Sequence, residues 1–157
     1  MEMNMREKVI HNYMAGYNQF DVEKMIADFD ESIVFENIQN GIITMTLRGI
    51  AAFQQQAEQA KSYFSSRKQT VISIHHQNAT TEVAIQYSAI LAMDFPNGLK
   101  KGQELTLTGK SIFEFDNRKI IKLTDVSWAF HSELSQIDII HQFNFVILFS
   151  MLVLGFL

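Results

Sequence analysis

The hydrophobic period of the sequence changes near Gln69, and this change limits the folds open to the chain. Before it, helical spacing dominates, as in the face formed by Val9, Tyr13 and Tyr17, which predicts an amphipathic helix of about four turns. After it, apolar and polar residues alternate through four successive segments, which predicts strands. Helices followed by a strand meander are typical of an α+β domain with an antiparallel sheet covered on one face.

The other predicted elements follow without a linker. In the first half we expect two further helices and a strand pair, at Val22–Phe29, Ile50–Phe64, Ile33–Ile38 and Ile42–Leu47. In the second half we expect strands at Val71–His76, Val83–Phe95, Glu104–Phe115 and Lys119–Val126. A chain of 157 residues that is 47% hydrophobic can bury one such core.

Charge and composition exclude several classes of function. The net charge is -4, and basic residues occur in short pairs such as Arg67-Lys68, which we interpret as solvated surface, so nucleic-acid binding is not expected. The absence of cysteine excludes disulfides and thiolate metal sites. Adjacent His75 and His76 would point to opposite faces of a strand, and no other histidine has ligand spacing. We therefore expect no metal and no cofactor, and, without a visible signal peptide, a cytoplasmic location.

Four short motifs, taken in order, indicate a family. They are Tyr13-(x)3-Tyr17-Asn18-(x)2-Asp21-Val22-(x)2-Met25, Val34-Phe35-Glu36-Asn37, Gly49-Ile50-(x)2-Phe53 and Ile120-Ile121-Lys122-Leu123-Thr124-Asp125. Together they resemble the nuclear-transport-factor-2-like superfamily, especially its SnoaL-like, polyketide-cyclase-like branch. The resemblance implies a cone in which a curved, antiparallel-rich sheet and three helices enclose a pocket. That fold hosts isomerases, cyclases, epoxide hydrolases and non-catalytic modules, so it leaves the function open.

Asp125 is the first candidate for a catalytic residue. In the last predicted strand it shares a face with Ile121 and Leu123, so an interior position would desolvate its carboxyl and raise its pKa. The resemblance implies a working acid at this position in the cyclase and epoxide-hydrolase branches. The alternative is that Asp125 only hydrogen-bonds the chain where it leaves the sheet.

Asn37 is the second candidate, because it lies on the same strand face as Phe35. Its position resembles the water-placing Asn of the limonene-epoxide-hydrolase branch, but the Arg–Asp pair of that branch is missing here. Compared with ketosteroid isomerase, Tyr13 matches the oxyanion-hole tyrosine and Asn37 the carboxylate base. An amide cannot abstract a proton, and Glu36 would point through the opposite face. That isomerase, itself a standard example of pKa tuning, is therefore a poor match.

The leading hypothesis is a pocket for a small apolar ligand. Asp125 would act as acid or base on a carbonyl compound, in a lyase, isomerase or cyclase without a cofactor, while Asn37 and Tyr13 donate hydrogen bonds. The pocket wall is expected to include five aromatic side chains: Tyr13, Tyr17, Phe35, Tyr87 and Trp128. The alternative is a non-enzymatic ligand-binding or dimerisation module. In either case the resemblance implies a homodimer built on the outer face of the sheet.

The C-terminal segment departs from the family, and we place the domain boundary between residues 1–133 and a tail at residues 134–157. Phe143–Leu157 carries no charge, yet its fifteen residues would span only ~22 Å as a helix, short of the roughly 30 Å of a bilayer core. Three interpretations stay open: a shallow membrane-binding helix, a segment packed on the domain or its dimer mate, and a frameshifted end. We favour a helix that the fold does not need, over a membrane function.

Deleting residues 134–157 should therefore leave a soluble domain that unfolds cooperatively, because the predicted core ends before them. Urea denaturation of the truncated and full-length chains measures this. A truncated chain that is unfolded, beside a soluble and monomeric full-length chain, would show that the tail belongs to the core.

Overall fold

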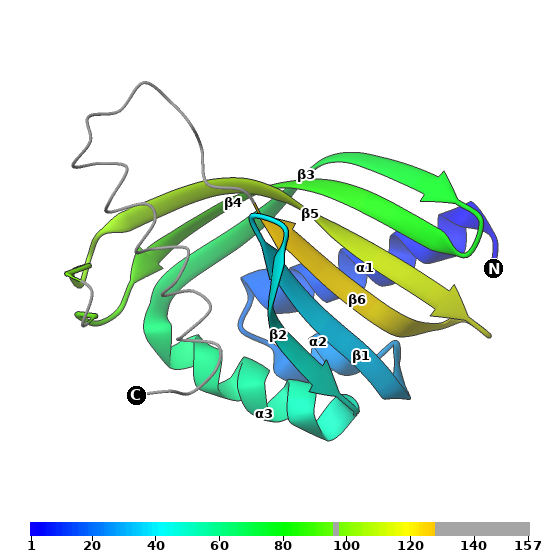
Figure 1. The fold of residues 1–157 in the computed structure, drawn as a ribbon, viewed down its shortest axis with the longest axis horizontal. Coiled ribbons are helices and arrows are strands. Elements are labelled where there is room, and N and C mark those ends of the chain that lie inside the picture. Colours follow the sequence, from blue (N-terminus) through cyan, green and yellow to red (C-terminus); the bar gives the residue numbers. More distant parts are fainter. Residues whose placement is uncertain (96–97, 128–157) are drawn as a thin grey trace.

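The computed structural model describes residues 1–95 and 98–127, and their fold is an open, curved sheet with the helices on its concave side (Figure 1). The helices are α1 (Met3–Asn18), α2 (Val22–Ile26) and α3 (Ile50–Ala60), with a 3-10 turn, η1, at Lys61–Tyr63. The strands are β1 (Phe29–Gln39), β2 (Ile42–Arg48), β3 (Phe64–Gln77), β4 (Thr80–Leu91), β5 (Glu104–Asp116) and β6 (Lys119–Ser127). The α+β class and the element order expected from the sequence are confirmed.

Two helices are shorter than the sequence predicted. Asp21 caps α2 as expected, since its Oδ1 accepts the Lys24 N–H at 3.0 Å. However, α2 ends at Ile26 and α3 at Ala60, because Phe29 and Phe64 open the next strands. Both phenylalanines are buried. A buried apolar residue at the boundary fits the pattern of a helix and the pattern of a strand equally well, so the sequence does not show where the helix ends.

The strand order is β2-β1-β6-β5-β4-β3. Strands β3 to β6 form the predicted antiparallel meander. Strand β1 lies beside β6 and runs parallel to it, so the sheet is mixed. All its other pairings are antiparallel, in agreement with the antiparallel-rich sheet that was expected. Alternation tells which face a side chain takes but not which strand lies next to it, and the partners here are far apart in the chain: Asn37 lies opposite Asp125.

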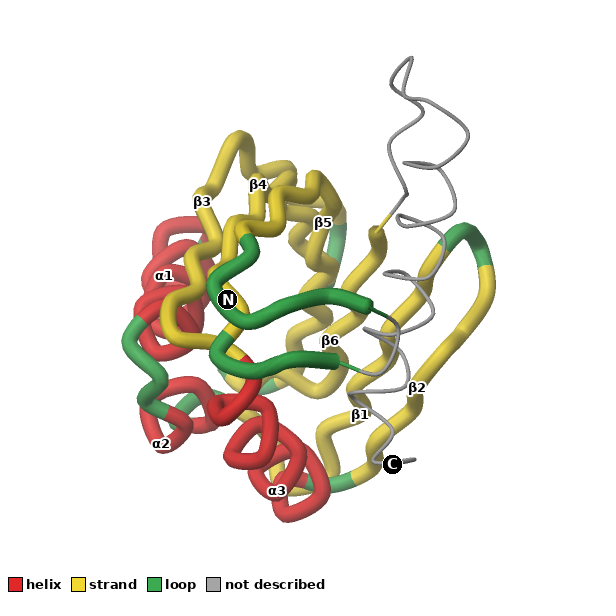
Figure 2. The backbone as a smooth tube through the Cα atoms, turned by 90° about the vertical axis from the view of Figure 1, so that its left-hand side faces the viewer, coloured by secondary structure: helices red, strands yellow, loops and turns green. Residues whose placement is uncertain are grey.

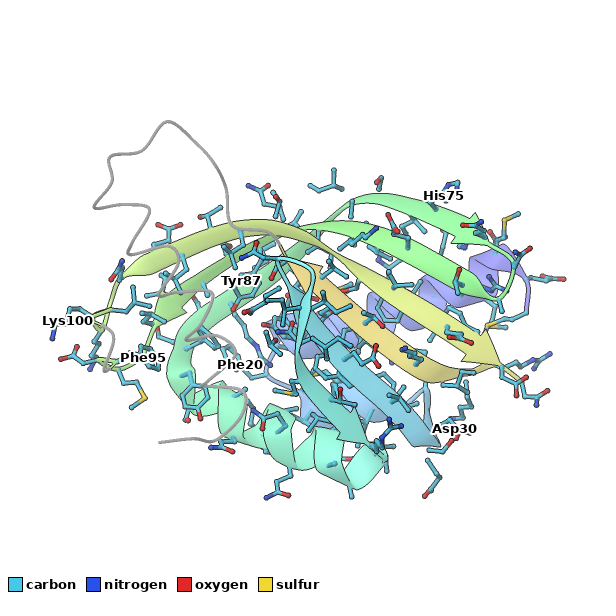
Figure 3. All side chains as sticks on the ribbon, in the orientation of Figure 1. Phe20, Asp30, His75, Tyr87, Phe95 and Lys100 are labelled. Atoms are coloured by element: carbon cyan, nitrogen blue, oxygen red, sulfur yellow. The ribbon has the colours of Figure 1, made fainter. Side chains whose placement is uncertain are left out.

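Figure 2 shows the helices along one side of the curved sheet. The buried apolar side chains of the helices and the sheet pack together as the core. Its most completely buried large side chains come from α1, β1, β5 and β6: Ile10, Ile33, Phe113, Ile120 and Leu123. A second apolar cluster lies at the end of the sheet where β4 leads toward β5, around Phe64, Tyr87 and Leu91. Figure 3 shows Lys100 at one end of the molecule, and Asp30 and His75 toward the other.

The end of α1 is joined to the edge strand β3. The Asn18 Oδ1 accepts the backbone N–H of Gln69 at 2.7 Å, and its Nδ2 donates to the backbone carbonyl of the same residue at 3.1 Å. One side-chain amide thus satisfies both outward backbone groups of Gln69, which no neighbouring strand could pair.

Trp128 and the tail at 134–157 lie outside the described residues, so the domain boundary stays a prediction. None of the helices in the described ranges has the length and apolar character that crossing a membrane requires.

Gly16 lets α1 and α2 approach closely. A Cβ at this position would lie 2.8 Å from the Met25 backbone N and 2.9 Å from the Asp21 carbonyl O. Gly16→Ala should therefore destabilise the domain by about 1–3 kcal/mol, although alanine is the better helix former. Urea denaturation measures the change, with His11→Ala, an exposed position of the same helix, as the control. Stabilisation by Gly16→Ala would show that the two helices have room to separate.

Candidate functional site

A partly open cavity of about 150 Å³ lies between the sheet and the helices. Its wall is mostly apolar, with side chains such as Phe35, Leu47 and Phe53 at one end and Phe64 and Leu107 at the other. Tyr87 lies on the side of the sheet that faces α3 in Figure 3. A cavity of this size accommodates roughly one aromatic ring.

Three polar side chains on neighbouring strands form a row on the face of the sheet that borders the cavity. Asn37 of β1 lies opposite Asp125 of β6, and Asp125 lies opposite Ser111 of β5. Since residues in register share a face of the sheet, the pairing of these strands brings the side chains together. All three line the cavity.

Asp125 is half-buried and lines the cavity. Desolvation raises the pKa of its carboxyl from 3.8 to about 6, although a hydrogen bond from the Ser111 hydroxyl lowers the pKa in part. Ser111 is completely buried, so this bond also fixes the direction of the carboxyl. The carboxyl therefore changes charge close to neutral pH inside an apolar pocket.

Asn37 is buried, and its amide is held in place. Its Nδ2 donates to the Thr44 Oγ1 at 2.8 Å, and that hydroxyl donates to the Asn37 backbone carbonyl at 3.2 Å. An amide nitrogen carries two hydrogens, so this bond uses only one of them.

Tyr13 of α1 lines the same cavity as these three side chains. Its ring is 3% exposed and packs between Phe29 and Phe113, with centroid distances of 5.7 and 5.6 Å. Desolvation, and then the nearby charge of Asp125, raise the pKa of Tyr13 well above its usual value. Tyr13 thus stays a neutral hydrogen-bond donor on the same cavity as Asp125.

Tyr17 and Tyr87 form a second polar pair in the cavity. Their rings meet edge to face at 6.2 Å, and their hydroxyls interact. Desolvation raises the pKa of both phenols. Phe35 packs on Phe53 with 5.5 Å between the ring centroids, and it also lines the cavity. Among the residues predicted for the wall, only Trp128 lies outside the described part of the chain.

Arg67 also lines the cavity, contrary to the prediction from the sequence. It was interpreted as solvated surface, but it is 5% exposed and lines the cavity, while the adjacent Lys68 is exposed. The prediction was wrong because it began this strand at Val71, whereas β3 begins at Phe64. Extending the alternation back from Val71 through Gln69 would have placed Arg67 on the inner face.

Within residues 1–95 and 98–127, no group of three or more His, Asp or Glu side chains is arranged to hold a metal ion. His75 is exposed, while His76 contacts the Thr81 hydroxyl at 2.9 Å and a Glu7 oxygen at 3.1 Å. Glu36 points away from the cavity to Lys122, with 2.9 Å between Oε2 and Nζ.

Comparison with solved structures shows the same fold at low sequence identity. A candidate polyketide cyclase from Xanthomonas campestris superposes with a TM-score of 0.70 at 15% identity, covering 88% of this chain and 96% of that one. AclR, a candidate hydroxylase from Streptomyces galilaeus, gives 0.65 at 18% identity, covering 80% and 90%. An epoxide hydrolase of the LEH-like type from M. tuberculosis gives 0.64 at 13% identity, covering 79% and 83%.

No curated protein sequence matches the chain significantly. The SnoaL-like domain family matches residues 10–123, which include α2, α3, most of α1 and the strands up to Leu123 in β6. Asp125 lies two residues beyond the matched part. The chain therefore belongs to the SnoaL-like domain family of the nuclear-transport-factor-2-like superfamily.

Proposed function

We propose that this protein binds a small apolar carbonyl compound and catalyses proton transfer at the carbon beside its carbonyl group. The observation that carries the proposal is the Asp125 carboxyl, which lines an apolar cavity and whose pKa is raised to about 6. A general base works best when its pKa lies near the working pH. At neutral pH Asp125 is mostly ionised, yet it is a stronger base than an exposed aspartate.

The chemistry needs two kinds of group. The ionised Asp125 takes a proton from the carbon beside the carbonyl, and the electron pair moves to the carbonyl oxygen to give an enolate. Asn37 and Tyr13, which line the same cavity, donate hydrogen bonds to that oxygen. The protonated Asp125 then returns its proton to the enolate at the same carbon or at a conjugated one. Isomerases, cyclases and some lyases share this first step.

The step can be tested before the natural substrate is known. Apolar ketones of one ring, such as acetophenone, are incubated with the full-length protein in deuterium oxide, and NMR follows the exchange of the protons beside the carbonyl. Asp125→Asn should slow protein-catalysed exchange by at least about a hundredfold. The wild-type rate should rise with pH through about 6 and then level off, because the ionised carboxyl is the active form. Exchange no faster than in buffer would favour a binding module without catalysis.

Asp125→Asn should also change how stability depends on pH. The folded state holds the Asp125 proton more tightly than the unfolded state, so this contribution to stability is complete below a pH of 3.8 and is lost as the pH rises through about 6. The difference of about two pKa units is worth no more than about 3 kcal/mol. The variant cannot titrate, so its stability relative to wild type should increase between about pH 4 and about pH 8.

Urea denaturation of both proteins at the two pH values gives this difference. Asp116→Asn, an exposed position at the end of β5, is the control. If the difference between Asp125→Asn and wild type does not depend on pH, the carboxyl is solvated and the proposed base is wrong.

Tyr13→Phe removes a single hydroxyl from the cavity and keeps the ring that packs on Phe29 and Phe113. The exchange rate should fall by roughly a hundredfold because one donor to the enolate oxygen is lost. The free energy of unfolding should change by less than about 1 kcal/mol, since the ring contacts remain. A large loss of stability with an unchanged exchange rate would assign Tyr13 to the core instead.

A further inference from the structure

Arg67 is held at the cavity by a hydrogen bond to the backbone of α1 and by contacts to two ring faces. Its Nε donates to the Tyr17 carbonyl O at 2.9 Å. The guanidinium carbon lies 3.9 Å from the Tyr17 ring centroid and 4.5 Å from that of Phe20. Contacts of this kind use the face of the guanidinium, so its N–H edge is left for hydrogen bonds, one of which it makes with the Tyr17 side chain.

That edge carries a donor that the described residues do not satisfy. The Arg67 Nη2 is buried and has no hydrogen-bond partner within residues 1–95 and 98–127. In the same part of the chain no ion pair includes Arg67, whereas Lys110 and Lys122 are paired with Glu82 and Glu36. A buried charge without a counter-charge is costly, and arginine cannot lose its proton to avoid that cost. A site built this way is completed when an anion enters it.

The positive charge of Arg67 reaches the cavity tyrosines. Desolvation raises the pKa values of Tyr13, Tyr17 and Tyr87, and the charge of Arg67 acts on each of them in the opposite direction. Asp125 does not neutralise this charge. The two residues lie on β3 and β6, which are separated by β4 and β5, and no ion pair joins them among the described residues.

Two glutamines add unsatisfied polar atoms to the same cavity. The Gln56 Nε2 and the Gln69 Oε1 are buried and, like the Arg67 Nη2, have no hydrogen-bond partner among the described residues. Gln69 follows Arg67 by two positions on β3, so the two side chains share a face. Donors from Arg67 and Gln56 suit an anionic oxygen, and the Gln69 oxygen suits a hydroxyl or an N–H group.

We propose that Arg67 binds the carboxylate of the ligand, so that the ligand class is apolar organic acids that also carry a carbonyl group. That the ligand is an acid is inferred from Arg67 alone, and that it carries a carbonyl group rests on the proposed function. The acid lies against β3, and the apolar body extends along Tyr13 and Tyr17 toward Asp125. A charge-assisted hydrogen bond formed away from water gives the preference for an acid over a neutral analogue of the same shape.

Paired probes test the proposal without knowledge of the natural ligand. Phenylacetate and 3-phenylpropionate, each with its neutral amide, are titrated into the full-length wild-type protein by calorimetry at neutral pH. Each acid should bind at least about tenfold more tightly than its amide. Arg67→Gln should abolish that preference, and Lys68→Gln, which removes the same charge from the exposed neighbouring position, should keep it. Equal binding of acid and amide to wild type, or no binding of either acid, would overturn the proposal.

A second measurement covers the case in which Arg67→Gln does not fold. In wild-type protein labelled with 15N at arginine, the side-chain Nε–H signal of Arg67 should shift on addition of an acid and stay unchanged with its amide. The same result in Asp125→Asn separates the two proposals. If ketone exchange fails and the acid preference persists, only the proposed function is wrong. If exchange is seen and the acid preference is absent, only the role of Arg67 is wrong.

Discussion

The fold depends on the parallel pairing of β1 with β6. It joins the first half of the chain to the end of the strand meander and places β6 in the interior of the sheet, where Ile120 and Leu123 are completely buried. Such long-range pairing must overcome a loop-closure cost, which the packing of α1 and α3 against the sheet offsets. Without this pairing Asn37 would not lie opposite Asp125.

The candidate site begins where the core ends. Leu123 belongs to the core, and Asp125, two residues further along the same face of β6, lines the cavity. The same change occurs on α1, where Tyr13 packs among phenylalanines and Tyr17 meets Tyr87 one turn later. Apolar packing that stabilises one end of each element therefore removes water from the polar groups at the other end. The raised pKa of Asp125 is a direct consequence of this arrangement.

Strand alternation was enough to place Asp125 and Asn37 on an inner face, because each lies two residues from an apolar side chain of the core, Leu123 and Phe35. It could not show that β1 and β6 are neighbours, since a face preference carries no information about the partner strand. Arg67 was missed for a different reason. The predicted strand began at Val71, whereas β3 begins at Phe64, so Arg67 was left outside the strand. Its place on the inner face follows from regular alternation once the strand is extended back to its true start.

The contact between Asn18 and Gln69 has a consequence for assembly. An edge strand presents free backbone groups that can pair with the edge of another molecule, which is a common route to aggregation. At Gln69 of β3 both groups are already occupied by the Asn18 amide, so α1 covers this point of the edge as a short extra strand would. Another chain could extend the sheet past this point only by first displacing the end of α1. Asn18, the last residue of α1, thus also protects the domain against strand exchange.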